Sequence, residues 1–303
     1  MPELPEVETI VRGLARRVVG DTITSVWIGS RTQPLKSPAA EIARTLEGAS
    51  IASVHRTGKH IVFGLVRDAG AGHPFDKLRA GSRNRRRDAG ATVKNAAADR
   101  ATQDRTTAQW VVHLGMTGRM VVCEPGAEIA RHTHLIATLA SGRELRFIDP
   151  RMFGKLSVHA AFDPGGVEPL DLDEETFVKL FHGRKTPIKS ALLNQKLLRG
   201  VGNIYADESL FRAGLRPRRR ASTITRAQLG KLCESVREVL REAIALGGSS
   251  ISDYVDADGE EGFFQLQHRV YGREGEKCLI CKTPIRRVVM VGRSSHYCPR
   301  CQK

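Results

Sequence analysis

The sequence of 303 residues has no long apolar run and few aromatic residues, which make up 5% of the chain. Its best apolar run, IVFGLV at 61–66, spans six residues, whereas a membrane helix needs roughly 18. Arg12, Arg16 and Arg17 interrupt the apolar positions near the start, so there is no continuous apolar core of a secretory signal peptide. We therefore expect a cytoplasmic protein without a membrane partner.

Acidic residues are also in short supply. Asp and Glu number 33 against 48 Lys and Arg, which gives a net charge of +15. A charge of this sign and size attracts polyanions, of which nucleic acid is the commonest inside cells. A basic enzyme with another kind of substrate is the alternative. Ten Lys and Arg and five Asp fall between Arg67 and Thr107, so most of the excess lies elsewhere.

The segment at about 69–107 lacks large apolar residues. Phe75, Leu78 and Val93 are the exceptions among Gly, Ala, Asp and Arg. Such a composition cannot bury a core, so we predict a disordered insertion within a β domain.

The chain begins with a predicted helix. Pro5 suits a first helical position, Glu6 suits the positive end of the helix dipole, and Gly20 suits the stop. The apolar positions repeat as on one buried face, at Val7, Ile10, Val11, Leu14 and Val18. We expect this stripe to fix the start of the chain against the β domain.

The remaining patterns predict an α+β protein. Short β-type runs separated by turn signals fill 22–66 and 109–160, as in a sandwich or barrel. Helical periodicity dominates from Glu174 to Leu246. A Gly/Ser/Asp-rich stretch then precedes a C-terminus that carries most of the cysteines.

Four of the six cysteines form two pairs, Cys278-x2-Cys281 and Cys298-x2-Cys301, sixteen residues apart. This spacing predicts a closed tetrahedral site for one structural zinc ion. Disulfides are the alternative, disfavoured in a chain without secretion signals. Between the pairs, RRVVMVGRSSHY predicts a hairpin whose turn presents Arg293 to a phosphate. A solvated arginine is the alternative.

A second anion site is predicted at GVGN. Gly200 and Gly202 precede a helix that starts near Asn203. Backbone N–H groups at such a start can bind a phosphate. The alternative is a plain glycine turn.

The start of the chain contains a candidate nucleophile. Methionine before proline is normally removed, which leaves Pro2 with a free secondary amine. An α-amino group has a pKa of about 7.7–8.0, against about 10.4 for Lys, so more of it is unprotonated at neutral pH. Such an amine attacks an anomeric carbon or an aldehyde and forms an iminium ion. Glu3 is placed to move protons, and Lys59 in RTGKH is a further cation.

Several motifs together resemble the bacterial formamidopyrimidine-DNA glycosylase family, whose members are 8-oxoguanine glycosylases with apurinic/apyrimidinic lyase activity. They extend in order from Pro2 to the C-terminus, interrupted at roughly 69–107. The motifs are PELPEVETI, TGKH, HLGMTGRM, IDPRMFGK, NQKLLRGVGNIYADE, RVYGREGEKC and GRSSHYCPRC.

The resemblance implies a fold, a reaction and a partner. The fold would be an N-terminal helix and β-sandwich at 1–160, a helix-two-turn-helix DNA-binding domain at 161–265 and a zinc finger at 266–303. The reaction would be excision of oxidised purines in base excision repair, followed by β- and δ-elimination. The partner would be double-stranded DNA containing oxidised bases, bound by a monomer.

The resemblance also implies residue roles. Pro2 would be the nucleophile that forms a Schiff base, Glu3 the proton donor and acceptor, and Lys59 a contact to the lesion and its phosphates. A loop near 247–262 would cover the everted base. The residues implied to touch DNA are Met116, Arg151 and Phe153, which fill the hole left by the flipped nucleotide, and Asn203 and Arg293, which grip phosphates.

Departures and alternatives remain. Met152 stands where a second Arg is common in the family, which should slightly reduce the attraction for phosphate. An endonuclease VIII-like glycosylase for oxidised pyrimidines is one alternative, disfavoured by Leu4 and by the complete Met116, Arg151 and Phe153 set. A non-catalytic zinc-finger DNA-binding protein is the other, disfavoured by the intact Pro2–Glu3 start.

Overall fold

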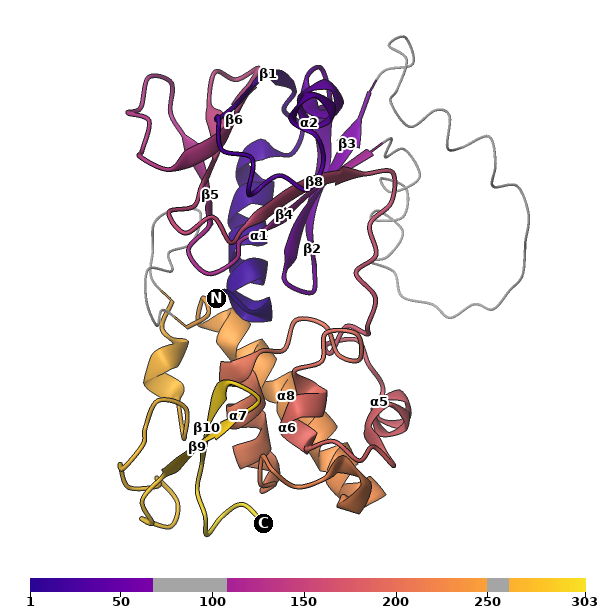
Figure 1. The fold of residues 1–303 in the computed structure, drawn as a ribbon, viewed down its shortest axis with the longest axis vertical. Helices are drawn as coiled ribbons and strands as arrows, with labels where there is room; N and C mark the ends of the chain where they lie inside the picture. Colours follow the sequence, from indigo (N-terminus) through magenta and orange to yellow (C-terminus); the bar gives the residue numbers. More distant parts are fainter. Residues whose placement is uncertain (68–107, 250–261) are drawn as a thin grey trace, which may run out of the picture. The chain divides into compact units, whose positions relative to one another are not determined.

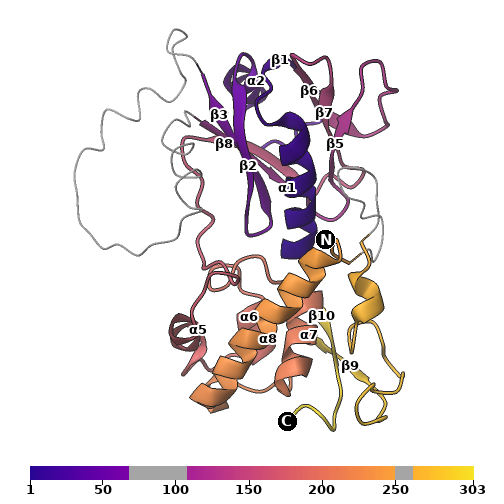
Figure 2. The same ribbon diagram turned by 180° about the vertical axis from the view of Figure 1, so that it is seen from behind.

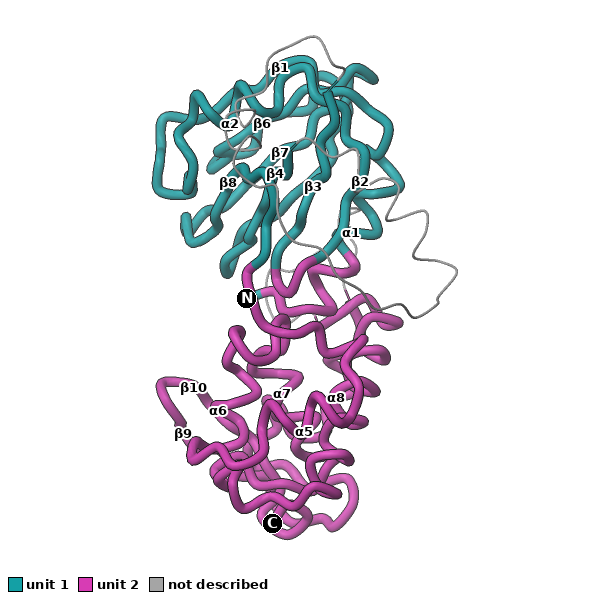
Figure 3. The backbone as a smooth tube through the Cα atoms, turned by 90° about the vertical axis from the view of Figure 1, so that its right-hand side faces the viewer, with its two compact units in different colours: residues 1, 10–56, 60–163 teal, residues 2–9, 57–59, 164–303 magenta. Residues whose placement is uncertain are grey.

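The computed structural model describes residues 1–67, 108–249 and 262–303. The predicted insertion at 69–107 and residues 250–261 of the predicted loop at 247–262 lie outside these residues. The described chain forms two compact units (Figure 3). Unit 1 comprises residues 1, 10–56 and 60–163, and unit 2 comprises residues 2–9, 57–59 and 164–303.

Unit 1 contains two four-stranded sheets, and its strands are coloured indigo to magenta in Figure 1. One sheet has the order β1-β6-β7-β5, with bounds Ile23–Ile28, Thr133–Leu139, Glu144–Ile148 and Arg119–Cys123. The other has the order β2-β3-β4-β8, with bounds Ser50–Thr57, His60–Val66, Ala108–His113 and Lys155–His159. The predicted α+β class with a β-sandwich is confirmed.

Large aromatic side chains fill the interior of unit 1. Phe63 of β3 and Trp110 of β4 stack with ring centroids 4.6 Å apart, and both are fully buried. These two strands pair in antiparallel register, with Phe63 opposite Trp110. A short helix, α2 (Ala39–Leu46), was not predicted. It buries only Ile42, Thr45 and Leu46, which is too short a stripe for a helical period to be recognised.

In its described residues, unit 2 contains the helices α5 to α8 and a two-stranded hairpin. Two helix starts are capped by side chains: Asp173 accepts from Thr176 N–H before α5, and Thr225 forms a capping box with Gln228 before α8. The long helix α8 packs along α7 (Figure 2). The bounds are Glu174–Phe181 for α5, Ile188–Leu192 for α6, Asn203–Ala213 for α7, Arg226–Ala245 for α8, Arg286–Met290 for β9 and Arg293–Tyr297 for β10.

The predicted first helix exists as α1 (Leu4–Val18), but its start packs differently from the prediction. Residues 2–9 belong to unit 2, and the fully buried Leu4 is part of the core that α5–α8 enclose. The Leu4 N–H donates to the Gly200 carbonyl oxygen at 3.0 Å. The apolar stripe itself is buried as predicted, and four of its five positions, from Ile10 to Val18, belong to unit 1 with the two sheets. Only the residues before Ile10 group with unit 2, which periodicity could not predict because it shows which residues are buried but not against which neighbours.

No helix in the described ranges combines the length and the apolar character that crossing a membrane requires.

Candidate active site

The Glu3 carboxylate lies at the N-terminus of α7, within unit 2. Its Oε1 accepts a 3.2 Å hydrogen bond from the backbone N–H of Ile204, one of the groups that a helix start leaves without an intrahelical partner. Glu3 is 5% exposed, and its Oε2 accepts no hydrogen bond from any described residue. The helix start predicted to bind an anion thus holds a carboxylate of the protein itself.

Two glycines make room for the first residues. A Cβ on Gly202 would lie 2.1 Å from Glu3 Cδ and 2.3 Å from Oε1. Gly200 has a φ of +91°, which favours glycine, and a Cβ there would lie 2.7 Å from Leu4 Cδ1. The backbone of the GVG segment therefore packs directly against Glu3 and Leu4, which only glycine allows at these two positions.

Gly202→Ala is expected to displace Glu3 and slow base release by about a hundredfold, the order of loss for a misplacement of about 1 Å. The backbone at Gly202, with φ −130° and ψ −159°, is one that alanine adopts, so the fold is expected to survive. Single-turnover release of the damaged base gives the rate. Glu3→Asp removes one methylene from the side chain that the new Cβ would displace. The double variant Glu3→Asp/Gly202→Ala is therefore expected to release the base faster than Gly202→Ala alone. A Gly202→Ala enzyme with an unchanged rate would contradict the role of Gly202 in placing Glu3.

Glu6 fixes the backbone of Glu3. Glu6 Oε2 accepts from the Glu3 N–H at 2.8 Å, which is one half of a capping box. Glu6 Oε1 accepts from the Tyr205 hydroxyl and, at 2.8 Å, from the Ser249 N–H. Burial and the neighbouring Glu3 raise the pKa of Glu6, and these hydrogen bonds oppose the rise. Pro2 itself is half-buried beside this network, and Met1 is 46% exposed.

Lys59 lies in the turn between β2 and β3 and is 7% exposed. Burial lowers the pKa of its ammonium group, Glu3 and Glu6 raise it, and Arg293 lowers it further. Lys59 is therefore within electrostatic reach of Glu3 and of Arg293, residues far apart in the sequence.

The turn that carries Lys59 is held by a charged pair. The Gly58 N–H donates to Glu168 Oε1 at 2.7 Å, and Arg199 Nε donates to the same oxygen at 3.0 Å. Gly58 has a φ of +59°, which glycine tolerates without cost. All three residues belong to unit 2.

The two predicted phosphate grips also belong to unit 2. Asn203 is the first residue of α7, and its buried side-chain Oδ1 accepts no hydrogen bond from the described residues. Arg293 is the exposed first residue of β10 and follows a turn in which Val291 and Gly292 have positive φ. The hairpin prediction is confirmed, with Arg293 opposite Met290.

A buried ion pair that the sequence did not reveal supports the Arg293 hairpin. Lys189 of α6 and Asp207 of α7 are both almost fully buried, with Nζ 2.7 Å from Oδ1. Lys189 Nζ also donates to the Ser294 carbonyl oxygen at 2.8 Å, and Asp207 Oδ2 accepts from the His296 N–H at 2.8 Å. Both charges therefore hold the backbone of β10, directly after Arg293.

Glu208 secures the segment that leads to the cysteines. Its carboxylate accepts from three successive backbone N–H groups, those of Arg269, Val270 and Tyr271, at 2.8–3.0 Å. Burial raises the pKa of Glu208, and these hydrogen bonds lower it. Charged residues on a helix are expected to be solvated, so no sequence signal pointed to Glu208 or Asp207.

The remaining predicted DNA contacts, Met116, Arg151 and Phe153, lie on two neighbouring loops of unit 1. Each is exposed, and the Arg151 guanidinium carbon lies 5.1 Å from the centre of the Phe153 ring. A Cβ on Gly115 would lie 2.6 Å from the Gly154 nitrogen. This close approach of the backbones places the loop that carries Met116 next to the loop that carries Arg151 and Phe153.

Asp149 joins these two loops from inside. Its Oδ1 accepts from the Thr117 hydroxyl at 2.6 Å and from the Arg151 N–H at 3.3 Å, and its Oδ2 accepts from the Gly154 N–H at 2.7 Å. Asp149 has no exposed surface. The positions of the three exposed side chains are therefore set by one buried carboxylate.

The four C-terminal cysteines converge as predicted. The sulfur atoms of Cys278, Cys281, Cys298 and Cys301 all lie within 4.8 Å of one another. Four thiolates at this separation suit a tetrahedral zinc ion with no open position, so the ion is structural. Hydrogen bonds from Thr283 lower the pKa of Cys281 to about 6, which favours its thiolate. These four cysteines form the site of one structural zinc ion.

Family comparisons cover most of the chain. Residues 1–156 match the formamidopyrimidine-DNA glycosylase N-terminal domain, residues 166–255 match the H2TH domain of the same enzyme, and residues 275–303 match the zinc finger found in FPG and IleRS.

Whole-chain relatives agree with these matches. The chain is 43% identical over 307 residues to the formamidopyrimidine-DNA glycosylase of Solibacter usitatus and 37% identical over 319 residues to that of Gluconobacter oxydans, with full coverage of all chains. Among solved structures, it is similar to Lactococcus lactis Fpg in complex with abasic-site DNA, with a TM-score of 0.81, 29% identity and 99% of both chains covered. It is also similar to Thermus thermophilus MutM (Fpg), with a TM-score of 0.78, 36% identity, and 99% and 98% coverage. The chain belongs to the formamidopyrimidine-DNA glycosylase family.

Proposed function

We propose that this protein, once Met1 has been removed, is a bifunctional DNA glycosylase and abasic-site lyase that excises oxidised purines in base excision repair. The observation that supports this most is the placement of Glu3. Its buried carboxylate keeps Oε2 without a hydrogen-bond donor, next to Pro2 and within electrostatic reach of Lys59. The carboxylate is thus held in place while one oxygen stays available for a proton.

The reaction begins at the sugar of the damaged nucleotide. The Pro2 amine attacks C1′, the bond from C1′ to the base breaks, and the base leaves with a proton. Glu3 donates a proton to the ring oxygen, so the sugar opens and the nitrogen lone pair forms an iminium ion. Because the amine is secondary, this iminium has no N–H proton to lose and stays cationic.

The iminium then serves as an electron sink. Removal of a C2′ proton expels the 3′ phosphate by β-elimination, and a second elimination expels the 5′ phosphate. Water releases the remaining sugar fragment and restores the amine. The product is a one-nucleotide gap with a phosphate on each side, and Glu3 is the group that returns protons between steps.

The nucleotide has to leave the helix for this attack. A base inside a duplex keeps its sugar out of reach, and flipping leaves a vacancy that side chains must fill. Met116, Arg151 and Phe153 are exposed together, which supports a role as the filling group. Asn203 and Arg293 would hold the phosphates beside the everted sugar.

We extend the proposal to the partner, the oligomeric state, the location and the domain boundaries. The partner is double-stranded DNA that contains an oxidised base, the protein acts as a monomer, and the cytoplasm is its location. We retain the division into domains at 1–160, 161–265 and 266–303.

The test is trapping with borohydride, which reduces an iminium to a stable covalent bond. Duplexes carry either 8-oxoguanine opposite cytosine or an oxidised thymine. An adduct with the first duplex is expected. An adduct with the thymine lesion alone would identify an endonuclease VIII-like enzyme, and binding without any adduct would leave a non-catalytic DNA-binding protein.

A further inference from the structure

Two arginines of unit 2 have no role in the site described above. Arg218 and Arg220 belong to the sequence RPRRR at 216–220 and are exposed. Within the three described ranges, neither side chain takes part in a hydrogen bond or an ion pair. We propose that they form, with the exposed Lys185, a phosphate-binding surface for the duplex outside the lesion; this rests on the proposed function. We call these three residues the basic ribbon.

The four arginines of RPRRR differ in the contacts that their side chains make. Arg216 donates from Nε to the Gln302 carbonyl oxygen and from a terminal nitrogen to that of Pro299, both at 2.9 Å. Arg219 donates to the Thr223 carbonyl oxygen at 2.7 Å and to Gln228 Oε1 at 3.0 Å. Arg216 and Arg219 therefore stabilise the fold, and the two arginines adjacent to Arg219 are left for a ligand.

The backbone holds the basic ribbon in one place. Residues 219–222 run beside 184–188: the Ile188 N–H donates to the Arg219 carbonyl oxygen at 2.8 Å, and the Ala221 N–H donates to that of Thr186 at 3.0 Å. Two basic segments are thus placed side by side. An ordered pair of segments positions its charges for a ligand better than a disordered tail does.

Carboxylates are absent from both segments. No Asp or Glu occurs between Glu175 and Asp207 or between Glu208 and Glu234. Clustered like charges repel one another and lower the stability of the fold. A ligand with repeated negative charge relieves that repulsion, and a DNA backbone offers such charges at regular spacing.

Lys189 links the basic ribbon to the phosphate grip at Arg293. Its backbone N–H donates to the Pro217 carbonyl oxygen at 3.3 Å, one residue before Arg218. Its side chain donates to Ser294, one residue after Arg293. The basic ribbon and Arg293 therefore lie on two segments that Lys189 joins. A duplex whose phosphate is bound at Arg293 can place further phosphates of its backbone along the basic ribbon.

The test compares Arg218→Ser/Arg220→Ser with the unmodified chain on lesion duplexes extended by about one helical turn, or 10 base pairs, on one side or the other. Each phosphate contact contributes about 0.9 to the magnitude of the slope of log affinity against log salt concentration. In the double variant the magnitude of this slope is therefore expected to decrease by about 2, and the affinity at low salt is expected to decrease about tenfold. The defect should appear with one extension only. Adduct formation at saturating DNA should be unchanged, because neither arginine touches the site.

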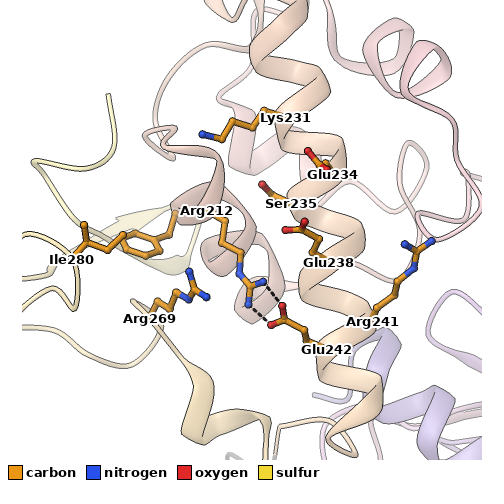
Figure 4. Close-up of a pocket in the computed structure, with 10 residues that line it drawn as sticks. Arg212, Lys231, Glu234, Ser235, Glu238, Arg241, Glu242, Arg269 and Ile280 are labelled. Atoms are coloured by element: carbon orange, nitrogen blue, oxygen red, sulfur yellow. Dashed lines mark hydrogen bonds and ion pairs between the residues drawn. The ribbon is translucent and has the colours of Figure 1, made fainter.

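The control removes the same charge from α8. Lys231 and Arg241 line a cavity of about 700 Å³ together with Glu234, Glu238 and Glu242 (Figure 4), and both belong to α8, outside the two segments that carry the basic ribbon. Lys231→Ser/Arg241→Ser is expected to keep the salt slope, and Arg218→Lys/Arg220→Lys is expected to keep both slope and affinity.

The results separate the two proposals. An unchanged slope in the Ser pair, or an equal loss in the Lys pair, would overturn the basic ribbon. Weaker binding of a free acidic peptide with unchanged DNA binding would also overturn it. Failure of the unmodified chain to form any adduct would overturn the proposed function instead. The salt slope would still test the basic ribbon, because it measures DNA binding and not catalysis.

Discussion

A chain that keeps Met1 is expected to bind lesion DNA but to form no borohydride-trapped adduct, with excision slowed by at least about a thousandfold, as when a catalytic nucleophile is lost. Met1 turns the Pro2 nitrogen into an amide, whose lone pair is delocalised and cannot attack C1′. The comparison uses two preparations of one sequence, distinguished by mass spectrometry, so every other side chain is identical.

DNA affinity and zinc content provide the control, because Met1 is exposed and its presence leaves the side chains of Asn203, Arg293 and the four zinc-binding cysteines chemically unchanged. Equal adduct yield in the two preparations would mean that another amine reacts. Lys59 would then be the first residue to examine, since burial lowers its pKa and increases its unprotonated fraction.

Removing zinc is expected to abolish specific DNA binding and to destabilise the whole of unit 2. Cys298→Ser removes one of four ligands from a cluster whose core includes Phe211 of α7. If the hairpin detaches, Lys189 loses its hydrogen bond to Ser294 and Asp207 loses its hydrogen bond to the His296 N–H. Each hydrogen bond to a charged group contributes about 1.5–3 kcal/mol, and the Arg293 phosphate contact is lost as well.

Three measurements check this prediction: bound zinc, thermal unfolding and affinity for a lesion duplex. Cys123→Ser is the matched control, because Cys123 lies in β5 of unit 1, outside the zinc cluster. It is expected to match the unmodified chain in zinc content and affinity. A Cys298→Ser protein that retains stoichiometric zinc and full affinity would show that the metal is not needed to hold the hairpin.

Local patterns predicted much of the fold. Alternation and turn signals located the strands, helical spacing located α7 and α8, and cysteine spacing identified the zinc site, because each is a relation between residues close in sequence. The buried charges were not predictable in this way. Lys189 and Glu208 occur in helical stretches where such residues are usually solvated, and only tertiary contacts bury them.

Sequence patterns also could not predict that the first residues of the chain pack with the helices of unit 2. Leu4 is apolar in either environment, so its burial could be predicted but not its neighbours in the helical unit. Gly202 was recognised as a turn residue, yet the reason it has no side chain is the carboxylate of Glu3, about two hundred positions earlier in the chain.

Unit 2 is assembled from three separate stretches of the chain, and this limits where the protein can be cut into fragments that fold. A fragment cut at residue 164 would keep the zinc site, Asn203 and Arg293, but would lose residues 2–9 and 57–59. It would lack every reacting group, and loss of a buried leucine such as Leu4 leaves a cavity worth about 2–5 kcal/mol. The Gly200 carbonyl would lose its donor. Severing the chain at a linker therefore does not yield an independent DNA-binding module, because the helical half is completed by the beginning of the polypeptide.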